Sequence, residues 1–387
     1  MEIKVVLGLN FGDEGKGMVV QNLCKQALLE GKKPLVIRFS GGPQAAHTII
    51  NEGQVHVCSS FGSGSLLEIP TFYEDGCVDP ISLYIESSIL NNKASIYIKQ
   101  GVKIITPYDV LFSQNDPTTL SDGTCGKGVY ATVKRYEEKF FSTNELKTFD
   151  DCLNYLDAVK TYYNNLGYNF NINKNLEIKF CQCLLNLTFV HTGITLKNQF
   201  DVLIYEGTQG LLLDPTTSPF KPHVTSTELL PTIDWFGDTV EYYFVTRSYL
   251  TRHGNGYEPK KCDSFYDLTK KFETNKFNQF QGEFKTGVLS LDLINRTIDR
   301  NLLDERTGKF NLVITHMDIP IEQNKFMFEQ FGQIKTFKEL NLEVSPEEIC
   351  CYLANNINLD FDNIYYTNSP NSSLHISHLN HEQSRKK

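Results

Sequence analysis

The chain has 387 residues, of which 40% are hydrophobic and 21% charged, with a formal net charge of -9 at pH 7. These values are typical of a globular protein, so wholesale disorder is excluded, and the negative charge argues against a general nucleic-acid-binding protein. The length suffices for one large α/β domain or for two ordinary domains.

The ten cysteines are scattered and lack the paired spacing of a zinc site. We therefore expect reduced thiols, as in a cytoplasmic protein. The first residues show no apolar signal-peptide stretch behind a basic start, and no run approaches the roughly 18 apolar residues of a membrane helix. The sequence thus predicts an intracellular protein without a membrane segment.

The N-terminal region predicts a strand, a glycine-rich loop and a helix. Residues 2–9 (EIKVVLGL) are apolar and β-branched enough for a strand that is buried on both faces. The loop 10–17 (NFGDEGKG) follows, and residues 18–30 then have apolar side chains at helical spacing. Backbone N–H groups and a helix N-terminus in this arrangement can bind a phosphate, beside which Lys16 adds a positive charge.

This first loop is not a Walker A sequence. That pattern requires glycine where the chain has Asn10, and serine or threonine where it has Gly17. Because the loop offers no such hydroxyl to a magnesium ion, Asp13 is the expected carboxylate ligand. A plain tight turn is the alternative interpretation of the glycines.

Further strands are predicted in the first half of the chain at residues 34–39, 94–98 and 102–105. The first of these leads into the loop 40–48 (SGGPQAAHT), so His47 is expected on a loop at a strand end, with a structural histidine as the alternative to a catalytic one. Another glycine-rich loop occupies residues 121–128 (SDGTCGKG). Residues 137–200 have helical patterns at 150–163 and 175–187, which predict a helical insertion.

In the second half, strands are predicted at residues 201–205, 241–245 and 310–314, and the segment 363–366 (NIYY) follows near the end. Each is followed, directly or within a few residues, by a polar loop: 206–210 (EGTQG), 251–256 (TRHGNG), 315–318 (THMD) and 367–371 (TNSPN). Ligands of open α/β sheets bind at the carboxyl ends of the strands. The repeated arrangement of strand and polar loop therefore predicts one composite site along that edge.

Six motifs follow one another as in a known family: GDEGKG (12–17), AAHT (45–48), GTCGKG (123–128), EGTQG (206–210), PHVTS (222–226) and THMD (315–318). In these motifs the chain resembles the adenylosuccinate synthetase family. The resemblance extends from residue 3 to about residue 373, and the first and fourth motifs are its specific ones.

The resemblance implies a ligase that joins L-aspartate to C6 of IMP and hydrolyses GTP to GDP and phosphate. The γ-phosphoryl group passes to O6, which makes a poor leaving group a good one, and the amine then displaces phosphate to give adenylosuccinate. By match to the motifs, Asp13 takes the N1 proton, His47 stabilises charge on O6, and Lys16 and Gln209 complete the catalytic set. Mg²⁺ is implied as a cofactor, with Asp13 and the backbone carbonyl of Ala46 as ligands. A carboxylate base, a histidine and a bound metal ion around one oxygen are the groups that phosphoryl transfer requires.

The resemblance also implies two sets of binding residues. The nucleoside triphosphate would contact Gly12, Glu14, Gly15, Lys16, Gly17, Thr48, His316, Asp318, Thr367, Ser369 and Pro370. The nucleoside monophosphate and aspartate would contact Gln44, Ala45, Thr124, Cys125, Gln209, Thr225, Arg135, Arg252 and Lys285. Asp318 would accept two hydrogen bonds from guanine, with a solvated turn carboxylate as the alternative.

Several positions depart from the pattern of the family. Gln44 replaces an asparagine, Ala46 a glycine, Cys125 a threonine, Lys127 an arginine, and His316 the lysine of the guanine-reading motif. A lysine does not reproduce the bidentate contact of an arginine with phosphate. The choice of nucleotide is therefore less closely specified by these residues than in the family.

The largest departure concerns the loop that binds aspartate. The family has several arginines there, whereas residues 280–287 (FQGEFKTG) contain a single lysine, Lys285, and a glutamate. One lysine is a poor replacement for bidentate arginines. Arg252 and Arg247 are candidates to compensate, and Arg135 or a neighbour would be the arginine that the family supplies across a dimer interface.

These departures from the pattern of the family indicate a divergent branch, and viral enzymes are one example of such a branch. The phage 2-aminoadenylosuccinate synthetase uses dGMP and an adenine nucleotide, but typically lacks the carboxylates that this chain has as Asp13 and Asp318. We therefore favour IMP and GTP, with dGMP and ATP as the alternatives. A non-catalytic nucleotide-binding relative is a further alternative, against which the retention of Asp13, Lys16, His47 and Gln209 speaks.

The expected architecture is α/β, with one large, mostly parallel sheet, flanking helices and the helical insertion at about 137–200. A single domain is expected at residues 1–377, followed by a polar tail at 378–387. The resemblance implies a homodimer in the cytoplasm, or in the host cytoplasm if the protein is viral. Its expected partners are a purine nucleoside monophosphate, a nucleoside triphosphate and L-aspartate, without nucleic acid or membrane.

Overall fold

The computed structural model describes residues 1–138, 146–191, 193–220, 227–233, 239–268, 273, 275, 277, 279–301, 303, 305–369 and 373–377. The predictions for Thr225, for Pro370 and for the polar tail at residues 378–387 lie outside the described residues. The motif at residues 222–226 lies outside them as well.

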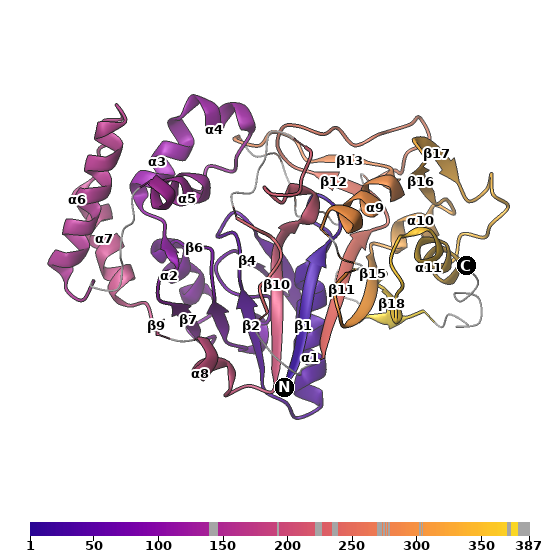
Figure 1. The fold of residues 1–387 in the computed structure, drawn as a ribbon, viewed down its shortest axis with the longest axis horizontal. Helices are drawn as coiled ribbons and strands as arrows, with labels where there is room; N and C mark the ends of the chain where they lie inside the picture. Colours follow the sequence, from indigo (N-terminus) through magenta and orange to yellow (C-terminus); the bar gives the residue numbers. More distant parts are fainter. Residues whose placement is uncertain are drawn as a thin grey trace.

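A ten-stranded sheet forms the centre of the molecule (Figure 1). Its strands are, in spatial order, β19 (His375–Ile376), β18 (Asn363–Tyr366), β15 (Lys309–Thr315), β11 (Val240–Arg247), β1 (Glu2–Gly8), β10 (Val202–Gly210), β2 (Pro34–Arg38), β5 (Thr71–Tyr73), β7 (Ile96–Lys99) and β9 (Phe189–Val190). Neighbours from β18 to β9 pair in parallel, and β19 is antiparallel to β18. The prediction of an α/β fold around a mostly parallel sheet is confirmed.

The apolar sequence of β1 follows from its position between β10 and β11, with both of its faces covered. Ile3, Val5 and Leu7 belong to the large core cluster on one face, and Val6 belongs to the cluster under helix α1 (Lys16–Leu29) on the other. A strand covered on both sides has no solvent-facing positions. This explains the uninterrupted run of residues without polar side chains from Val5 to Leu9.

The remaining helices are α2 (Pro80–Ile89), α3 (Pro107–Asn115), α4 (Pro117–Asp122), α5 (Val129–Glu138), α6 (Phe149–Asn165), α7 (Lys174–Leu185), α8 (Gly193–Lys197), α9 (Leu291–Arg300), α10 (Asp318–Glu322) and α11 (Pro346–Asn356). Helices α3 to α7 lie together at one end of the sheet, on the left in Figure 1. The helices predicted at 150–163 and 175–187 are confirmed as α6 and α7.

The helical region begins earlier than residue 137. Tyr108 and Phe112 of α3 share a core cluster with Tyr155 of α6 and Phe180 of α7. Helices α3 and α4 each have proline in the first turn, a position at which proline is compatible with a helix because no N–H is required there. The predicted start of the insertion was therefore too late.

Four small sheets and two 3-10 helices complete the structure that is described. Three of the sheets have two strands each: β3 (His47–Asn51) with β4 (Gln54–Cys58), β6 (Cys77–Val78) with β8 (Lys103–Ile104), and β12 (Leu250–Arg252) with β13 (Lys285–Gly287). The fourth sheet has three strands, β14 (Leu289–Ser290), β16 (Met327–Gln330) and β17 (Gln333–Thr336). The 3-10 helices are η1 (Ser65–Leu67) and η2 (Leu211–Leu213).

Two predicted loops are strands in the structure. His47 is the first residue of β3, and the motif at residues 206–210 is the second half of β10. Pairing with β1 continues to Gly210, which lies opposite Gly8. Both corrections have the same cause, since pairing with another strand overrides a local sequence rich in glycine and polar residues.

The parallel strands place their carboxyl ends at one edge of the sheet, the upper edge in Figure 1. The segments after β1, β2, β11, β15 and β18 and the end of β10 lie at that edge, as the sequence predicts. Within the described part of the chain, no helix is long and apolar enough to cross a membrane.

Candidate functional site

The first loop, residues 10–17, is shaped by residues with positive φ and by a buried carboxylate. Gly12, Asp13 and Gly15 have φ angles of 109°, 61° and 90°. Oε1 of Glu14 accepts hydrogen bonds from the backbone N–H groups of Asn10 (3.2 Å) and Gly12 (2.8 Å). The carboxylate of Glu14 therefore occupies part of the N–H cradle that the loop forms.

Lys16 completes this arrangement, because its Nζ donates to Oε2 of Glu14 at 2.6 Å and both side chains are buried. Burial opposes the charge of Glu14, but the Lys16 ammonium and the backbone N–H donors together lower its pKa. The loop thus holds a neutralised ion pair, and Lys16 is the first residue of α1.

Glycine at position 17 brings the first loop and His47 together. A Cβ added to Gly17 would stand 2.6 Å from Cβ of His47 and 2.8 Å from Oγ of Ser63, so no other residue fits without displacement. Gly15 is similarly close to Thr315, whose Oγ1 donates to the carbonyl of Glu14 at 2.8 Å. The two glycines let α1 approach β3 and β15 closely.

His47 forms a buried pair with Glu206. Nδ1 of His47 lies 2.5 Å from Oε1 of Glu206, to which the hydroxyl of Ser63 also donates, and the Ser63 N–H donates to Oε2 at 3.0 Å. Burial opposes ionisation of Glu206, yet its contacts with His47, Arg38 and Ser63 lower the pKa from 4.5 to about 2. Nε2 of His47 is buried without a hydrogen-bond partner among the described residues, so it is available to a ligand.

Asp13 is held from the side of β11 and β12. Its backbone carbonyl accepts a hydrogen bond from Nε of Arg247, and its Oδ2 lies 3.3 Å from Nε2 of His253. Arg247 is itself paired with Glu273 at 2.9 Å, so its charge is already neutralised. The His253 ring packs on Phe284, with 4.8 Å between the ring centroids.

Gln44 and Gln209 lie at the same edge of the sheet. A Cβ on Gly12 would stand 3.2 Å from Oε1 of Gln209, and one on Gly41 would stand 3.0 Å from Nε2 of Gln44. Oε1 of Gln44 is buried without a partner in the described structure. Buried polar atoms without a partner, here the Gln44 amide oxygen and, three residues later, Nε2 of His47, are typical of a site that binds a polar ligand.

Arg38 fixes the backbone of residues 42–45. Its guanidinium is buried and donates to the carbonyls of Phe61 (3.1 Å), Gly42 (3.2 Å) and Ala45 (3.3 Å). These bonds position the turn that carries Gln44 and that precedes His47. Ala46 is exposed in this turn, and Thr48 follows His47 in β3.

The segments at residues 315–318 and 367–369 are joined by backbone hydrogen bonds. The N–H of Met317 donates to the carbonyl of Thr367, and the N–H of Thr367 donates to the carbonyl of Ile314, both at 3.0 Å. His316 has a φ of 58°, and burial together with the nearby Arg247 lowers its pKa well below 6.5. Asp318 begins α10 and directly follows Met317, the residue that is bonded to Thr367.

The third glycine-rich loop, residues 121–128 with Thr124 and Cys125, packs on the segment after β12. Nδ2 of Asn255 donates to the carbonyl of Ser121 at 2.7 Å, and a Cβ on Gly123 would stand 3.1 Å from the backbone nitrogen of Asn255. Burial raises the pKa of the Cys125 thiol. In the short sheet that β12 and β13 form, Arg252 lies opposite Lys285, whose Nζ is paired with Glu258.

The structure does not bring Arg135 to this site. Its guanidinium is buried among α3, α5 and α6, where Nε and Nη2 donate to Asp109 at 2.8 Å and 2.9 Å and Nη2 also donates to the carbonyl of Ile104. Tyr163 donates a further hydrogen bond to Asp109 at 2.7 Å. A guanidinium committed in this way cannot bind a substrate, so the expectation for Arg135 is corrected to a structural role.

Sequence reasoning missed three residues that shape the site. Glu206 lies inside a motif that was recognised, but nothing in the sequence connects it with His47. Arg38 is the last residue but one of a predicted strand, and the sequence does not distinguish it from a surface arginine. His253 was part of a predicted loop, but only the structure shows that it lies beside Asp13.

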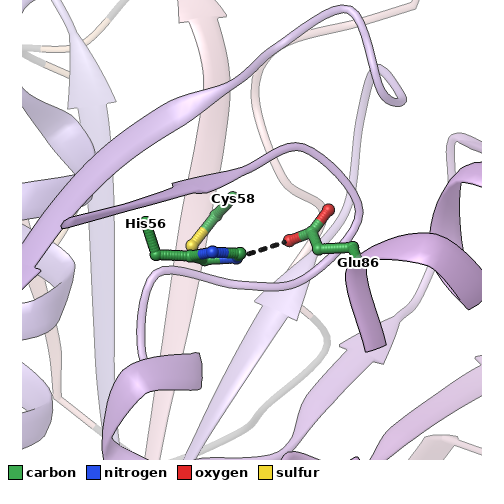
Figure 2. Close-up of side chains that lie close together, drawn as sticks. All are labelled: His56, Cys58 and Glu86. Carbon is green, nitrogen blue, oxygen red and sulfur yellow. Dashed lines mark hydrogen bonds and ion pairs between the residues drawn. The ribbon is translucent and has the colours of Figure 1, made fainter. Parts of the chain in front are cut away.

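A second histidine–glutamate pair lies on the same hairpin, between β4 and α2. Figure 2 shows the His56 ring directed at the Glu86 carboxylate, with Cys58 beside it, and the distance from Nε2 to Oε1 is 3.2 Å. Glu86 also accepts hydrogen bonds from the N–H groups of Ser59, Ser60 and Phe61 and from the Ser59 hydroxyl. These bonds occupy the carboxylate, and burial raises the pKa of the Cys58 thiol, so we assign the cluster a structural role.

Comparison with known proteins agrees with the resemblance of the motifs. The family model for adenylosuccinate synthetase matches residues 5–319. A curated adenylosuccinate synthetase from Thermoplasma volcanium is 26% identical over 294 residues, which cover 69% of this chain and 65% of that relative.

Two solved structures share the fold. The fully ligated adenylosuccinate synthetase from Plasmodium falciparum has a TM-score of 0.77 and 17% identity, with 97% of this chain and 100% of the other covered. The succinoaminodeoxyadenylate synthetase of cyanophage S-2L, bound to dGMP and to dATP as an energy donor, has a TM-score of 0.62 and 12% identity, with 97% and 95% covered. Since the family match spans most of the chain, this protein belongs to the adenylosuccinate synthetase family.

Proposed function

We propose that this protein is a ligase that forms a C–N bond between the amine of L-aspartate and C6 of IMP and hydrolyses GTP. The observation that carries the proposal is the contact between the first loop and the His47–Glu206 pair at Gly17. It brings a carboxylate, Asp13, and an imidazole with a free nitrogen to one end of the sheet. A 6-oxopurine needs both groups, because its O6 must gain negative charge before it can be phosphorylated.

In the proposed mechanism Asp13 accepts the N1 proton of the purine, which moves charge to O6. Nε2 of His47 then donates a hydrogen bond to O6 and to the phosphoryl group in transfer, while Glu206 keeps the proton-bearing imidazole oriented through Nδ1. A charge-assisted donor in a buried site stabilises developing charge more strongly than water does. The aspartate amine finally attacks C6, and phosphate leaves with O6.

Mg²⁺ fits the oxygen donors at this position. The Asp13 carboxylate and the Ala46 carbonyl are hard ligands, and the exposed Ala46 precedes the His47 that contacts Gly17. When bound, the ion would neutralise negative charge on the phosphates. Asp13 and the backbone carbonyl of Ala46 are the groups that would hold it.

The proposed triphosphate site uses the N-terminus of α1 and the first loop, through Gly12, Gly15, Lys16 and Gly17. The guanine would bind between Asp318 and the segment of Thr367 and Ser369. Because Glu14 fills part of the N–H cradle, the phosphates would contact the remaining N–H groups and the further N–H donors of Lys16. IMP would bind between Gln44, Gln209 and the loop of Thr124 and Cys125. We further propose a cytoplasmic homodimer, which gel filtration with light scattering tests.

Phosphate release from the purified protein tests the activity directly. The assay crosses GTP or ATP with IMP, GMP or dGMP, with and without aspartate. We expect turnover with GTP, IMP and aspartate together and none when one of them is omitted. Turnover that requires dGMP would support instead a succinoaminodeoxyadenylate synthetase, and silence in every mixture would support a nucleotide-binding relative without catalysis.

Two substitutions connect the activity with the site. Asp13→Ala and His47→Ala should each abolish product, whereas GTP binding measured by calorimetry should stay within about threefold of the wild type. Near-normal turnover in either variant would refute the mechanism. Arg300→Ala, at an exposed position on α9, is the matched control and should be fully active.

A further inference from the structure

Arg252 carries a buried positive charge that has no ion pair with any of the described carboxylates. Its side chain is 1% exposed, and Nη2 donates to the backbone carbonyl of Asn255 at 2.5 Å. Nε and Nη1 are buried without a hydrogen-bond partner in the part of the chain that the structure describes. Two of the three guanidinium nitrogens are therefore unused.

Two other buried arginines of the described structure have a carboxylate partner, and a third, Arg38, is held by three backbone carbonyls. Arg135 is paired with Asp109, and Arg247 with Glu273. A buried charge without a partner destabilises a fold, and it is tolerated where a ligand supplies the opposite charge. Burial lowers the pKa of Arg252 from 12.5 to about 10, which leaves the side chain charged at neutral pH.

Arg252 lies beside the first loop. Its guanidinium carbon is 4.6 Å from the centroid of the Phe11 ring. On either side of it in the chain, Oγ1 of Thr251 donates to the carbonyl of Gly12 at 3.0 Å, and His253 lies 3.3 Å from Asp13. The unused nitrogens are thus near Asp13, the residue to which the proton-accepting role is assigned.

Two further cations around this position already have a carboxylate partner. Lys285 lies opposite Arg252 on β13 and is bound to Glu258, and Lys16 is bound to Glu14. Arg252 is therefore the best candidate in the described site for an incoming anion. A guanidinium is also better suited than an ammonium to a planar carboxylate.

We propose that Arg252 binds a carboxylate of the amine donor and so takes over a function that arginines of a different loop perform in relatives. This inference rests on the proposed function, because it assigns the second substrate of that reaction. It also explains how a chain with only Lys285 between residues 280 and 287 could still bind an acidic amino acid.

Arg252→Met and Arg252→Lys test the proposal in steady-state phosphate release. Arg252→Met should raise KM for aspartate about 10- to 100-fold, as expected for a lost charge-assisted contact, and leave KM for IMP and GTP within about twofold. Arg252→Lys should give an intermediate KM for aspartate, because lysine keeps the positive charge but lacks the two parallel N–H donors of the guanidinium. The matched control is Arg296→Met. It removes an exposed arginine whose guanidinium carbon lies 6.0 Å from the centroid of the Phe220 ring, and it should leave the KM values for aspartate, IMP and GTP unchanged.

The thermal midpoint separates binding from a structural role. Because Arg252→Met removes an unpaired buried charge, its Tm should equal or exceed that of the wild type. A lower Tm with unchanged KM for aspartate would show that the contacts with Phe11 and Asn255 are the reason for the arginine and would overturn the proposal. A raised KM for a nucleotide with unchanged KM for aspartate would overturn it as well.

Calorimetry with succinate, a dicarboxylate without an amine, separates this inference from the proposed function. The wild type with bound nucleotides should bind succinate, and Arg252→Met should lose that binding by at least about tenfold. If turnover fails but this Arg252-dependent binding is present, the proposed function is wrong and the carboxylate site stands. No succinate binding by the wild type, or binding of inorganic phosphate instead, would overturn the site even if turnover is found.

Discussion

The β3–β4 hairpin carries two histidine–glutamate pairs that look alike in chemistry and differ in what they leave unbound. His56 meets Glu86 through Nε2, and the carboxylate receives four further hydrogen bonds from residues 59–61. His47 meets Glu206 through Nδ1, which leaves Nε2 buried and without a partner in the described structure. Both carboxylates hold the loop that follows the hairpin, one at residues 59–61 and the other at Ser63.

The difference shows that a buried acid–imidazole pair is not by itself a mark of catalysis. A pair whose polar atoms are largely occupied connects two elements, in this case β4 and α2. A pair with one free nitrogen can offer a proton to a ligand while its partner fixes the ring. The free atom, rather than the pair, is the reason why we propose His47 as the functional residue.

The largest expected effect separates the two histidines. His47→Gln should lower turnover by about 10²- to 10⁴-fold, because it removes the donor to O6, whereas His56→Gln should keep turnover within about twofold. Phosphate release measured on both variants under saturating substrates gives the comparison. Equal losses in the two variants would mean that the hairpin acts as a unit and that the free nitrogen has no special role.

The next effect concerns the partner of His47. Glu206→Gln keeps the shape of the side chain but removes the charge that orients and supports the imidazole, so turnover should fall about 10- to 100-fold. KM for GTP should be unchanged, because Glu206 makes no contact with the first loop in the described structure. Wild-type turnover at pH 7 would show that the carboxylate only holds Ser63.

Acid should remove a stabilising contribution of Glu206. Its pKa is about 2 in the folded protein and 4.5 without the fold, so its charge stabilises the native state above pH 4.5 and this contribution is lost as the pH falls towards 2. The shift corresponds to about 3 kcal/mol. In urea titrations, the stability advantage of the wild type over Glu206→Gln should be constant from pH 7 to 5 and shrink below pH 4.5. An advantage that persists at pH 3 would contradict this assignment.

The smallest effect on activity is expected at Glu86. Glu86→Gln leaves some of the N–H donors of residues 59–61 without a charged acceptor, which should lower the free energy of unfolding by about 1–3 kcal/mol. Turnover below the unfolding temperature should remain within about twofold of the wild type. Urea unfolding and phosphate release on the same preparation make this test, and a loss of turnover without a loss of stability would reverse the roles of the two pairs.

Much of the fold followed from local sequence. The strand at residues 2–9 was predicted because the apolar run from Val5 to Leu9 is typical of a strand that is covered on both faces, and the helices at 150–163 and 175–187 were predicted from their helical patterns. The motif at residues 206–210 was mistaken for a loop because its glycines are read locally as a turn. In the structure a Cβ on Gly210 would stand 2.1 Å from the carbonyl oxygen of Asn10, so glycine serves the close approach of two backbones.

A residue of the candidate site was predictable where its own motif contains the local features that mark a site. Asp13 and His47 were found because each lies in a glycine-rich segment at a strand end. The role of Glu206 was not, because its partner His47 is 159 positions away in the sequence. Arg135 was misassigned because order along the chain carries no information on burial, and only the structure reveals its pairing with Asp109.

The position of β1 in the sheet has a consequence for synthesis of the protein. Glu2 pairs with Val202 on one side, and Ile3 pairs with Val240 on the other, so the central strand lies 200 positions before its first neighbour in the sheet. At about 5–20 residues per second, a ribosome needs roughly 10–40 s to supply β10 after β1 has been made. During that time the nascent chain exposes an apolar segment without a sheet to join, which makes it a natural client of a chaperone. Chains truncated before residue 202 are accordingly expected to be retained by chaperones or to aggregate.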